Sequence, residues 1–450
     1  MMVQKFVGEG EKMERQIIFG TSVLENYPPK IDNTAIGYPG LASGGYSAFS
    51  IDEDLLSRHI LLLGGSGCGK TNAFLFTLDA IRKDMRQDDV AIIFDTKGEF
   101  YDMFSKEGDY VIGNSKRFRS ISHSWNLFEE ILADGEDENN ILVNIREIAA
   151  ALFHGRGSDS QPFFCNAARD IFRGILLHFI RMSKKEPGQW KGRLNNEDLL
   201  KAVRQFTVQD YIRIFNSYPD MKGLCTYIGD GNSGQALGVF GELNSMVSEY
   251  FFGILAKHQP ERSVSMCKAV RERGGRAIFV EYDLSVGETL TPIYRLLIDQ
   301  ALKEALGRNE KSGNIFVLAD EFKLLPKLQH IDDALNFGRG LGVKVIAGIQ
   351  SIDQLYDIYG KEKGAVIAGG FGSLFAFHTN DASSREYITK RFGSNIMVYG
   401  YMDRQHNRMI TNERNGNTVE DWEQLQLGLG QAVVGLGYEA PFLFQFERFS

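Results

Sequence analysis

The stretch HILLLGGSGCGKTNAFLF, residues 59–76, decides the fold of this chain. Its apolar first part predicts a buried strand, and the residues after the glycines predict a helix, so a glycine-rich loop joins a strand to a helix. The loop fits G-x-x-x-x-G-K-[ST] with Gly64, Gly69, Lys70 and Thr71 at the fixed positions. A chance glycine turn is the weaker interpretation in this context. The pattern therefore predicts a phosphate-binding loop.

Each residue type in the loop predicts a role at bound ATP and Mg²⁺. The glycines let backbone N–H groups surround a phosphate, and the positive end of the following helix faces the same anion. Lys70 is expected to reach the β- and γ-phosphates, and the Thr71 hydroxyl is expected to hold Mg²⁺. The predicted nucleotide-binding residues are Gly64, Gly65, Ser66, Gly67, Cys68, Gly69, Lys70 and Thr71.

An acidic pair ends a later apolar run, NIFVLADEF, residues 314–322. Asp320 is expected to orient hydrated Mg²⁺ through water, and Glu321 is expected to polarise the attacking water. A solvated strand end is the alternative. The earlier segment FDTKGEF contains Asp95 in the D-x-x-G pattern of GTPases, but the guanine-reading N-K-x-D is absent from the sequence. ATP is therefore favoured over GTP.

The segment GRGLGVKVIAGIQ, residues 338–350, supplies two further catalytic candidates. Gln350 ends another predicted strand, and ligands of open α/β sheets bind at the carboxyl ends of strands, so Gln350 is expected to sense the γ-phosphate. Arg339 lies before that strand and is therefore expected to face away from its own nucleotide. It is expected to act as an arginine finger across a subunit interface, and a solvated turn arginine is the alternative.

Strand-like apolar runs alternate with helical patterns along most of the chain, which predicts an α/β fold with a mostly parallel sheet covered by helices. A long interval between the third and fourth of these runs shows helical spacing and no convincing strand, and residues 155–275 are interpreted as an inserted helical domain. Asn196 and Thr207 are expected to cap two of its helices. The expected strands are 60–63, 90–94, 110–112, 277–282, 315–319, 343–349, 374–377 and 432–436.

Charge is unevenly divided. The whole chain has a formal net charge of −8, whereas residues 155–275 contain 17 Lys and Arg against 12 Asp and Glu. A basic insertion with an aromatic residue among its cations is typical of single-stranded DNA binding. The alternative is a solvated loop whose tryptophan docks on its own domain. The candidate DNA contacts in RMSKKEPGQWKGR are Lys184, Lys185, Trp190, Lys191 and Arg193.

Composition excludes several other classes. The four cysteines lie far apart, without a CxxC pair or a neighbouring histidine cluster, so neither a disulfide framework nor a zinc site is expected. No window reaches the roughly 18 apolar residues of a membrane span. A cytoplasmic location is expected.

Six segments together resemble the TraG/TraD-type conjugative coupling ATPases of type IV secretion, a branch of the FtsK/HerA superfamily, over roughly residues 55–440. They are GGSGCGKT, FDTKGEF, HSWNLFEEI, VLADEF, GRGLGVKVIAGIQSIDQLYDIYG and FAFHTNDASSREYITKRFG. The resemblance implies a RecA-like P-loop NTPase domain formed by residues 1–154 and 276–450, with the all-α domain at 155–275. It further implies a hexameric ring that uses ATP to move DNA, usually single-stranded, through a central channel.

The family pattern places the Walker A and Walker B positions, the arginine finger and the glutamine sensor on the residues named above. It also implies a relaxosome or components of a secretion channel as partners. Many members carry N-terminal membrane helices, and this sequence shows none, so no direct membrane insertion is expected and any attachment to the inner membrane is expected through partners.

Two other functions stay open at this level. One is a HerA-like ATPase in DNA processing or defence. The other is a nucleotide-dependent platform that docks a relaxosome or a protein substrate and hydrolyses ATP mainly to reset its assembly.

Overall fold

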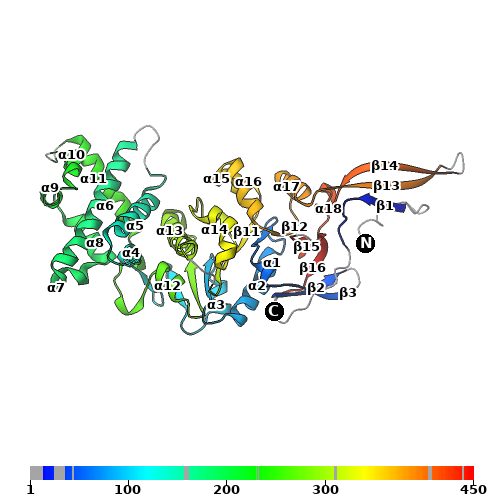
Figure 1. Cartoon of the computed structure of the whole chain (residues 1–450), viewed down its shortest axis with the longest axis horizontal. Helices are drawn as coiled ribbons and strands as arrows, with labels where there is room; N and C mark the ends of the chain where they lie inside the picture. Colours follow the sequence, from blue (N-terminus) through cyan, green and yellow to red (C-terminus); the bar gives the residue numbers. More distant parts are fainter. Residues whose placement is uncertain are drawn as a thin grey trace. The chain divides into compact units, whose positions relative to one another are not determined.

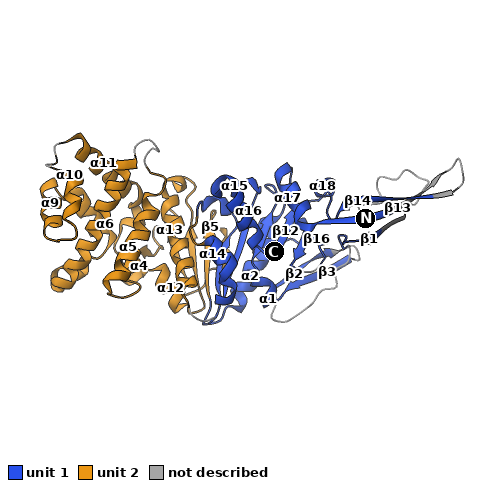
Figure 2. Ribbon diagram, turned by 45° about the horizontal axis from the view of Figure 1, so that its top comes forward, with its two compact units in different colours: residues 1–89, 309–327, 331–450 blue, residues 90–308, 328–330 orange. Residues whose placement is uncertain are grey.

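The computed structural model describes residues 14–24, 36–42, 45–156, 162–229, 231, 233–308, 312–403, 408–437 and 440–450. The chain forms two compact units, coloured separately in Figure 2. Unit 1 consists of Met1–Asp89, Asn309–Lys327 and Ile331–Ser450, and unit 2 consists of Val90–Arg308 and Leu328–His330.

Four parallel strands form the centre of unit 1, in the order β12-β4-β11-β10. Two of them, β11 and β12, are labelled in Figure 1. Every residue of these strands is buried. Parallel strands buried on both faces are continuous apolar runs, which is why the sequence located them to within one residue. The strands are β4 (Ile60–Leu63), β10 (Ile315–Ala319), β11 (Val343–Ile349) and β12 (Ser373–Phe377).

An antiparallel extension continues this sheet beyond β12, in the order β15-β16-β2-β3. Its core is aromatic: the Tyr38 and Phe49 rings stack with centroids 4.7 Å apart, and Phe375 and Phe446 meet Tyr38 edge-on. Only β15 was expected from the sequence. The strands are β2 (Ile36–Ala42), β3 (Gly45–Ile51), β15 (Gln431–Leu436) and β16 (Phe442–Phe446).

Unit 1 also contains a three-stranded antiparallel sheet that the sequence did not predict, in the order β1-β13-β14. Its strands are β1 (Glu14–Phe19), β13 (Ser394–Asp403) and β14 (Arg408–Asn417). The helices of unit 1 are α1 (Glu53–Leu56), α2 (Lys70–Asp84), α14 (Ile331–Phe337), α15 (Asp353–Tyr359), α16 (Lys361–Gly370), α17 (Ala382–Phe392) and α18 (Asp421–Gln424), with 3₁₀ turns η5 (Phe322–Leu324) and η6 (Gly338–Leu341).

Unit 2 contains three parallel strands in the order β5-β9-β6 and a large set of helices. The strands are β5 (Val90–Asp95), β6 (Tyr110–Gly113) and β9 (Arg276–Glu281). The helices are α3 (Glu99–Phe104), α4 (Leu127–Ile131), α5 (Glu138–Phe153), α6 (Pro162–Lys185), α7 (Pro187–Trp190), α8 (Asn196–Gln205), α9 (Val208–Asn216), α10 (Cys225–Ile228), α11 (Gly234–Tyr250), α12 (Met266–Glu272) and α13 (Gly287–Leu306).

The interval predicted to be helical is largely helical, but it also contains two short strands. Helix α6 packs against α5 and α11 through a buried apolar stripe. Two-residue strands, β7 (Ser124–Trp125) and β8 (Ser263–Val264), pair with each other inside the interval that was expected to lack strands. A strand of two residues is too short to show an alternating pattern in the sequence. The division of the chain at residues 155 and 275 into two domains stays a prediction.

One of the two predicted helix caps is wrong. Thr207 caps α9 in a capping box with Asp210, as expected. Helix α8 is capped by Asn195, whose Oδ1 accepts from the Asp198 N–H at 2.8 Å. Asn196 is instead buried, because tertiary contacts to the segments around Trp125 and Leu255 use its amide.

In the part of the chain that the structure describes, the helices are either too short or too polar to cross a lipid bilayer.

Candidate nucleotide-binding site

The glycine-rich loop joins β4 to α2 in unit 1, and its backbone demands glycine at several positions. Gly67 and Gly69 have φ of +71° and +109°, a region that residues with a Cβ rarely adopt. A Cβ on Gly64 would lie 2.6 Å from the Phe377 Cβ and 2.8 Å from the Cys68 Sγ. Cys68 is buried, and burial raises the pKa of its thiol. The loop is thus tightly packed, and Cys68 fills space inside it.

Lys70, the first residue of α2, is nearly buried within this loop. Its Nζ donates to the carbonyls of Gly64 at 2.6 Å and Gly65 at 2.9 Å. The Gly65 N–H donates in turn to the carbonyl of His378 at 2.8 Å, which ties the loop to the end of β12. The ammonium therefore lies in the loop itself, where a phosphate held by the loop would meet it.

Thr71 and Asp320, 249 positions apart in sequence, are brought into direct contact. The Thr71 hydroxyl donates to the Asp320 Oδ2 at 2.7 Å. Asp320 follows β10 directly, and β11 passes close to it, since a Cβ on Gly348 would lie only 2.2 Å from the Asp320 carbonyl oxygen. Gly348 was missed by the sequence analysis. Its signal was a single glycine inside the buried strand VKVIAGI.

Glu321 and Gln350 form a second contact beside the first. The Gln350 Nε2 donates to both carboxylate oxygens of Glu321, at 3.0 Å and 3.2 Å. Gln350 follows β11, and its own backbone N–H donates to the Gln354 side chain at 3.1 Å. The carboxyl ends of β4, β10 and β11 thus gather the glycine loop and both polar pairs at one edge of the sheet.

These residues fit ATP with Mg²⁺. A threonine hydroxyl beside a carboxylate supplies the hard oxygen ligands that Mg²⁺ prefers. A lysine inside a loop with left-handed glycines at the start of a helix suits a polyphosphate. The site lies wholly within unit 1.

Arg339 lies away from this edge. It belongs to η6, before β11, whereas Gln350 follows the strand, and a strand of seven residues spans roughly 20 Å. Its guanidinium is about half-exposed and pairs with Asp54 of α1. Arg58, and then Arg339, hold the pKa of the Asp54 carboxyl below its usual range. Arg339 is therefore not placed to act on the loop of its own chain.

Residues 46–403 match the family model described as the type IV secretion-system coupling protein DNA-binding domain. The chain belongs to this family.

Comparisons with individual coupling proteins are more distant. The chain is 23% identical to coupling protein TraD of Escherichia coli (strain K12) over 349 residues, covering 76% of this chain and 45% of TraD. It is 25% identical to protein VirD4 of Rhizobium radiobacter over 331 residues, covering 67% of this chain and 44% of VirD4. The chain thus spans less than half the length of these relatives.

Solved structures of one coupling protein share the fold. The plasmid coupling protein TrwB in complex with ADP and Mg²⁺ has a TM-score of 0.70 and 18% sequence identity, covering 98% of this chain and 96% of that chain. An unbound form of TrwB gives a TM-score of 0.70 over 89% of this chain and 87% of that chain. The expected α/β P-loop fold with a helical region is confirmed.

The D-x-x-G segment of this coupling-protein chain has a structural role. The Asp95 carboxylate accepts four backbone N–H groups, from Lys97, Gly98, Phe100 and Tyr101, at 2.8–3.1 Å, and so holds the start of α3. Its neighbour in register on β9 is Glu281.

The sequence analysis did not single out Glu281. The pattern that could have indicated it is a carboxylate at the end of a buried strand. It is 3% exposed, and among the described residues its Oε1 has no hydrogen-bond partner. Burial, and then the Asp95 charge, raises the pKa of Glu281 to about 9.

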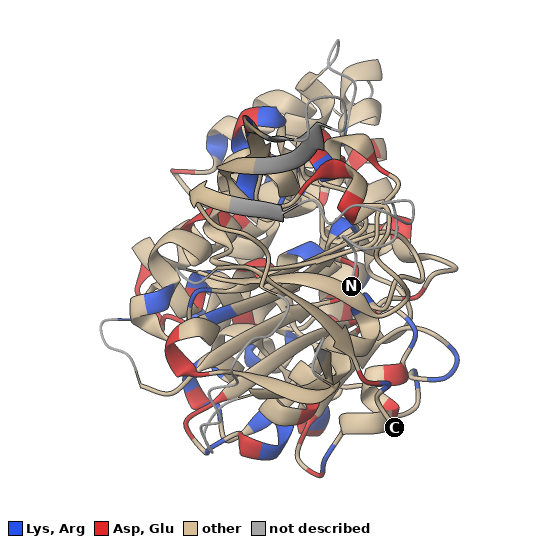
Figure 3. Cartoon of the chain, turned by 90° about the vertical axis from the view of Figure 1, so that its right-hand side faces the viewer, with Lys and Arg blue, Asp and Glu red and all other residues tan. Residues whose placement is uncertain are grey.

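The candidate DNA contacts lie in unit 2, at and after the end of α6. Trp190 is half-buried, with its ring edge-on to His178 at 5.4 Å and Phe179 at 5.3 Å. The Arg193 guanidinium lies over the Trp190 ring at 5.2 Å. Figure 3 faces the side of unit 1 that carries β13 and β14, and there Lys and Arg are interspersed with Asp and Glu. The four cations Lys184, Lys185, Lys191 and Arg193 are exposed.

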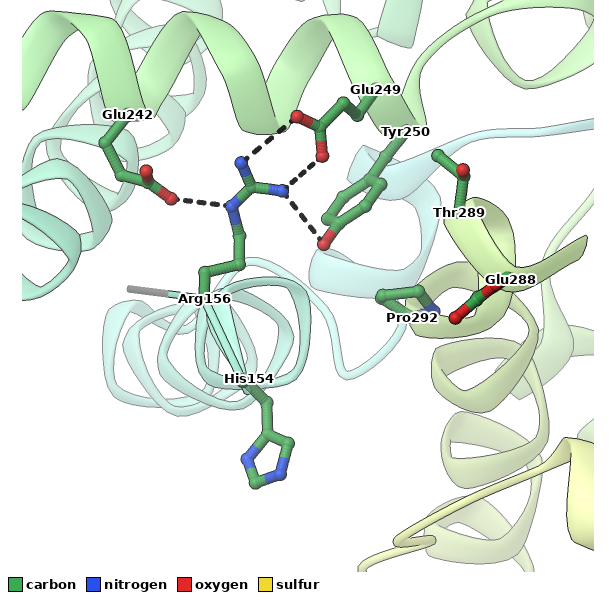
Figure 4. A pocket seen from close by; sticks show the side chains of 9 residues that line it. His154, Arg156, Glu242, Glu249, Tyr250, Glu288, Thr289 and Pro292 are labelled. Atoms are coloured by element: carbon green, nitrogen blue, oxygen red, sulfur yellow. Dashed lines mark hydrogen bonds and ion pairs between the residues drawn. The ribbon is translucent and has the colours of Figure 1, made fainter. Parts of the chain in front are cut away.

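A separate pocket of about 470 Å³ in unit 2 is lined on one side by a cluster of charged side chains (Figure 4). The Arg156 guanidinium donates to Glu242 and Glu249 at 2.6 Å each and to the Tyr250 hydroxyl at 3.1 Å. Its donors are engaged within the protein, so the cluster joins the end of α5 to α11.

Proposed function

We propose that this chain is the motor part of a type IV coupling protein, which binds ATP with Mg²⁺, hydrolyses it within a hexameric ring and moves DNA, with single strands favoured. The observation that carries the proposal is the meeting of the Thr71–Asp320 and Glu321–Gln350 pairs beside the glycine loop. The relatives TraD and TrwB are named as coupling proteins, and TrwB binds ADP and Mg²⁺.

Each polar group at the site has a distinct task in hydrolysis. Lys70 would neutralise charge on the terminal phosphates, and Thr71 and Asp320 would hold hydrated Mg²⁺, which would supply positive charge beside the leaving group. Glu321 accepts a proton from the attacking water on one of its carboxylate oxygens. Gln350 donates to both of those oxygens, so it would couple the carboxylate's position to the γ-phosphate that it senses in this proposal.

Arg339 completes the site of a neighbouring subunit in this proposal. Its position at the opposite end of β11 from Gln350 supports action between chains. An arginine finger supplied in trans raises the rate by roughly 10³ to 10⁵. A ring gives every subunit one neighbour of this kind.

The DNA path is proposed to include Lys184, Lys185, Lys191 and Arg193. These side chains are exposed, and their positive charges can pair with phosphates of the DNA backbone. Trp190 supports base stacking less well, because its ring already contacts His178, Phe179 and Arg193. A cytoplasmic location, with a relaxosome or a secretion channel as partner, belongs to the same proposal.

The test is steady-state ATP hydrolysis by wild type and Glu321→Gln, each with and without single-stranded DNA, together with mass by light scattering. We expect DNA and assembly to raise wild-type turnover and Glu321→Gln to lower it at least about 100-fold while ATP still binds. Glu362→Gln, at an exposed position of α16, is the matched control. A wild type that binds ATP, ignores DNA and stays monomeric would contradict the motor and favour a docking platform.

A further inference from the structure

We propose that the segment 425–431 forms the wall of the nucleotide site that contacts the base of the nucleoside triphosphate, with Leu429 as the apolar contact. The inference rests on the proposed function, because it takes a nucleoside triphosphate as the ligand. The segment lies outside the glycine loop and the strand-end residues of the site.

The segment touches the phosphate-binding loop through its backbone. The Gly430 N–H donates to the carbonyl of Cys68 at 2.9 Å. A Cβ on Gly69 would lie 2.9 Å from the Gly430 Cα, so the two backbones meet without intervening side chains. The segment therefore lies directly beside the start of α2, where the phosphates bind in the proposed function.

The backbone of the segment is held firmly. The Gln445 Nε2 donates to the carbonyl of Leu429 at 3.0 Å, and the Phe446 N–H donates to the carbonyl of Gly430 at 2.9 Å. The Gly428 N–H donates to the Gln431 side chain at 2.8 Å. Gly430 has φ of +75°, and a Cβ there would lie 2.7 Å from the Gln445 Nε2.

Leu429 nevertheless keeps its side chain in solvent, with 75% of the residue exposed. A single exposed leucine is common on protein surfaces. At Leu429, however, hydrogen bonds hold the backbone of the segment in place next to the predicted nucleotide site. Covering an exposed leucine side chain with a flat apolar face of a ligand removes apolar surface from water and so favours binding. The base of a nucleotide is such a face.

The topology of unit 1 indicates which end of the nucleotide lies here. The strand order is β15-β12-β4-β11-β10, and the loop follows β4 in the middle. Asp320, Glu321 and Gln350 end β10 and β11 on one side, so the γ-phosphate lies toward that side. The nucleoside then extends toward the other side, where segment 425–431 leads into β15.

The experiment measures affinity by calorimetry for two probes, MgATP and magnesium tripolyphosphate, which lacks the nucleoside. We expect Leu429→Ala to weaken MgATP about fivefold and to leave tripolyphosphate unchanged. Leu284→Ala is the matched control, since Leu284 is 72% exposed in unit 2. Thermal unfolding of the variants verifies that they fold as the wild type does.

Three outcomes decide between the ideas. Unchanged MgATP affinity in Leu429→Ala, or an equal loss for both probes, would overturn the base contact while leaving the motor intact. Loss of both probes in Lys70→Ala together with the selective effect of Leu429→Ala would support both proposals. A wild type that binds neither probe would overturn the proposed function itself and the base contact with it.

Discussion

Glu281 shows how one buried carboxyl couples stability to pH. It ends β9 inside unit 2, with Asp95 beside it in register and Arg117 and Asp102 as the other charges that act on it. Burial and the Asp95 charge favour its protonated form, and Arg117 opposes them only in part. A carboxyl whose pKa is higher in the folded than in the unfolded chain stabilises the fold at low pH and loses that contribution as pH rises.

The pKa of Glu281 is about 4.5 in the unfolded chain and about 9 in the folded chain. We therefore expect this residue to make the wild type less stable as the pH rises from about 4.5 to about 9. Glu281→Gln keeps the shape of the protonated carboxyl and cannot ionise, so it should melt several degrees above the wild type at alkaline pH and close to it under acidic conditions. Melting temperatures measured across this pH range test the prediction, with Glu99→Gln, at an exposed position of α3, as the control. Parallel curves for wild type and Glu281→Gln would contradict it.

Helix α8 shows how a helix start depends on contacts outside the helix. Asn195 and Asn196 both suit a cap by residue type, and Asn195 takes the role. The Asn196 amide donates to the carbonyls of Trp125 and Leu255, and its Oδ1 accepts from the Leu127 N–H at 3.0 Å. Asn196 thus joins three segments of unit 2.

We expect Asn196→Ala to lower the free energy of unfolding by about 3 kcal/mol, since it leaves three buried backbone groups without their partner. Asn195→Ala removes the cap together with the amide's local bonds to the Gly192 carbonyl and the Asp198 carboxylate, and should lower it less, by about 2 kcal/mol. Urea unfolding followed by circular dichroism measures both. A larger loss in Asn195→Ala than in Asn196→Ala would show that the cap, and not the three-way contact, holds α8.

At the scale of the assembled molecule, the two ends of β11 carry residues for two different sites in the proposed function. Gln350 at the carboxyl end contacts Glu321 of the same chain, and Arg339 at the amino end is directed away from it. Lys344 on the same strand is fully buried and contacts Glu53 and Asn314, which anchors the strand between its two ends.

A mixing experiment tests this arrangement. Lys70→Ala has a defective nucleotide site and an intact Arg339, whereas Arg339→Ala has the reverse, so each variant alone should hydrolyse little ATP. In mixed rings with equal shares, about a quarter of the sites should combine an intact loop with an intact neighbouring arginine and regain activity. Adding Arg58→Ala, a change of another Asp54 partner, to Lys70→Ala is the control and should not alter the recovery. No recovery on mixing would place the action of Arg339 within its own chain or outside catalysis.

The sequence by itself determined the central parallel strands, and it predicted the loop and strand-end residues that the structure brings together at one edge of the sheet. Buried parallel strands are continuous apolar runs, and a phosphate loop at a strand-to-helix junction demands its glycines and lysine in a set spacing. The acidic pair and Gln350 were also predictable, because strand ends of a parallel sheet meet at one edge.

Only the tertiary structure decided which distant groups meet. The strands β2, β3 and β16 depend on pairing with one another, so glycine- and proline-containing segments such as IGYPGLA carry no clear period of their own. The burial of Asn196, the close approach of Gly348 to Asp320 and the contact of Gly430 with the loop all join residues far apart in the chain. Local patterns describe the neighbours of a residue along the chain, whereas these contacts depend on which surfaces pack together once the sheet has formed.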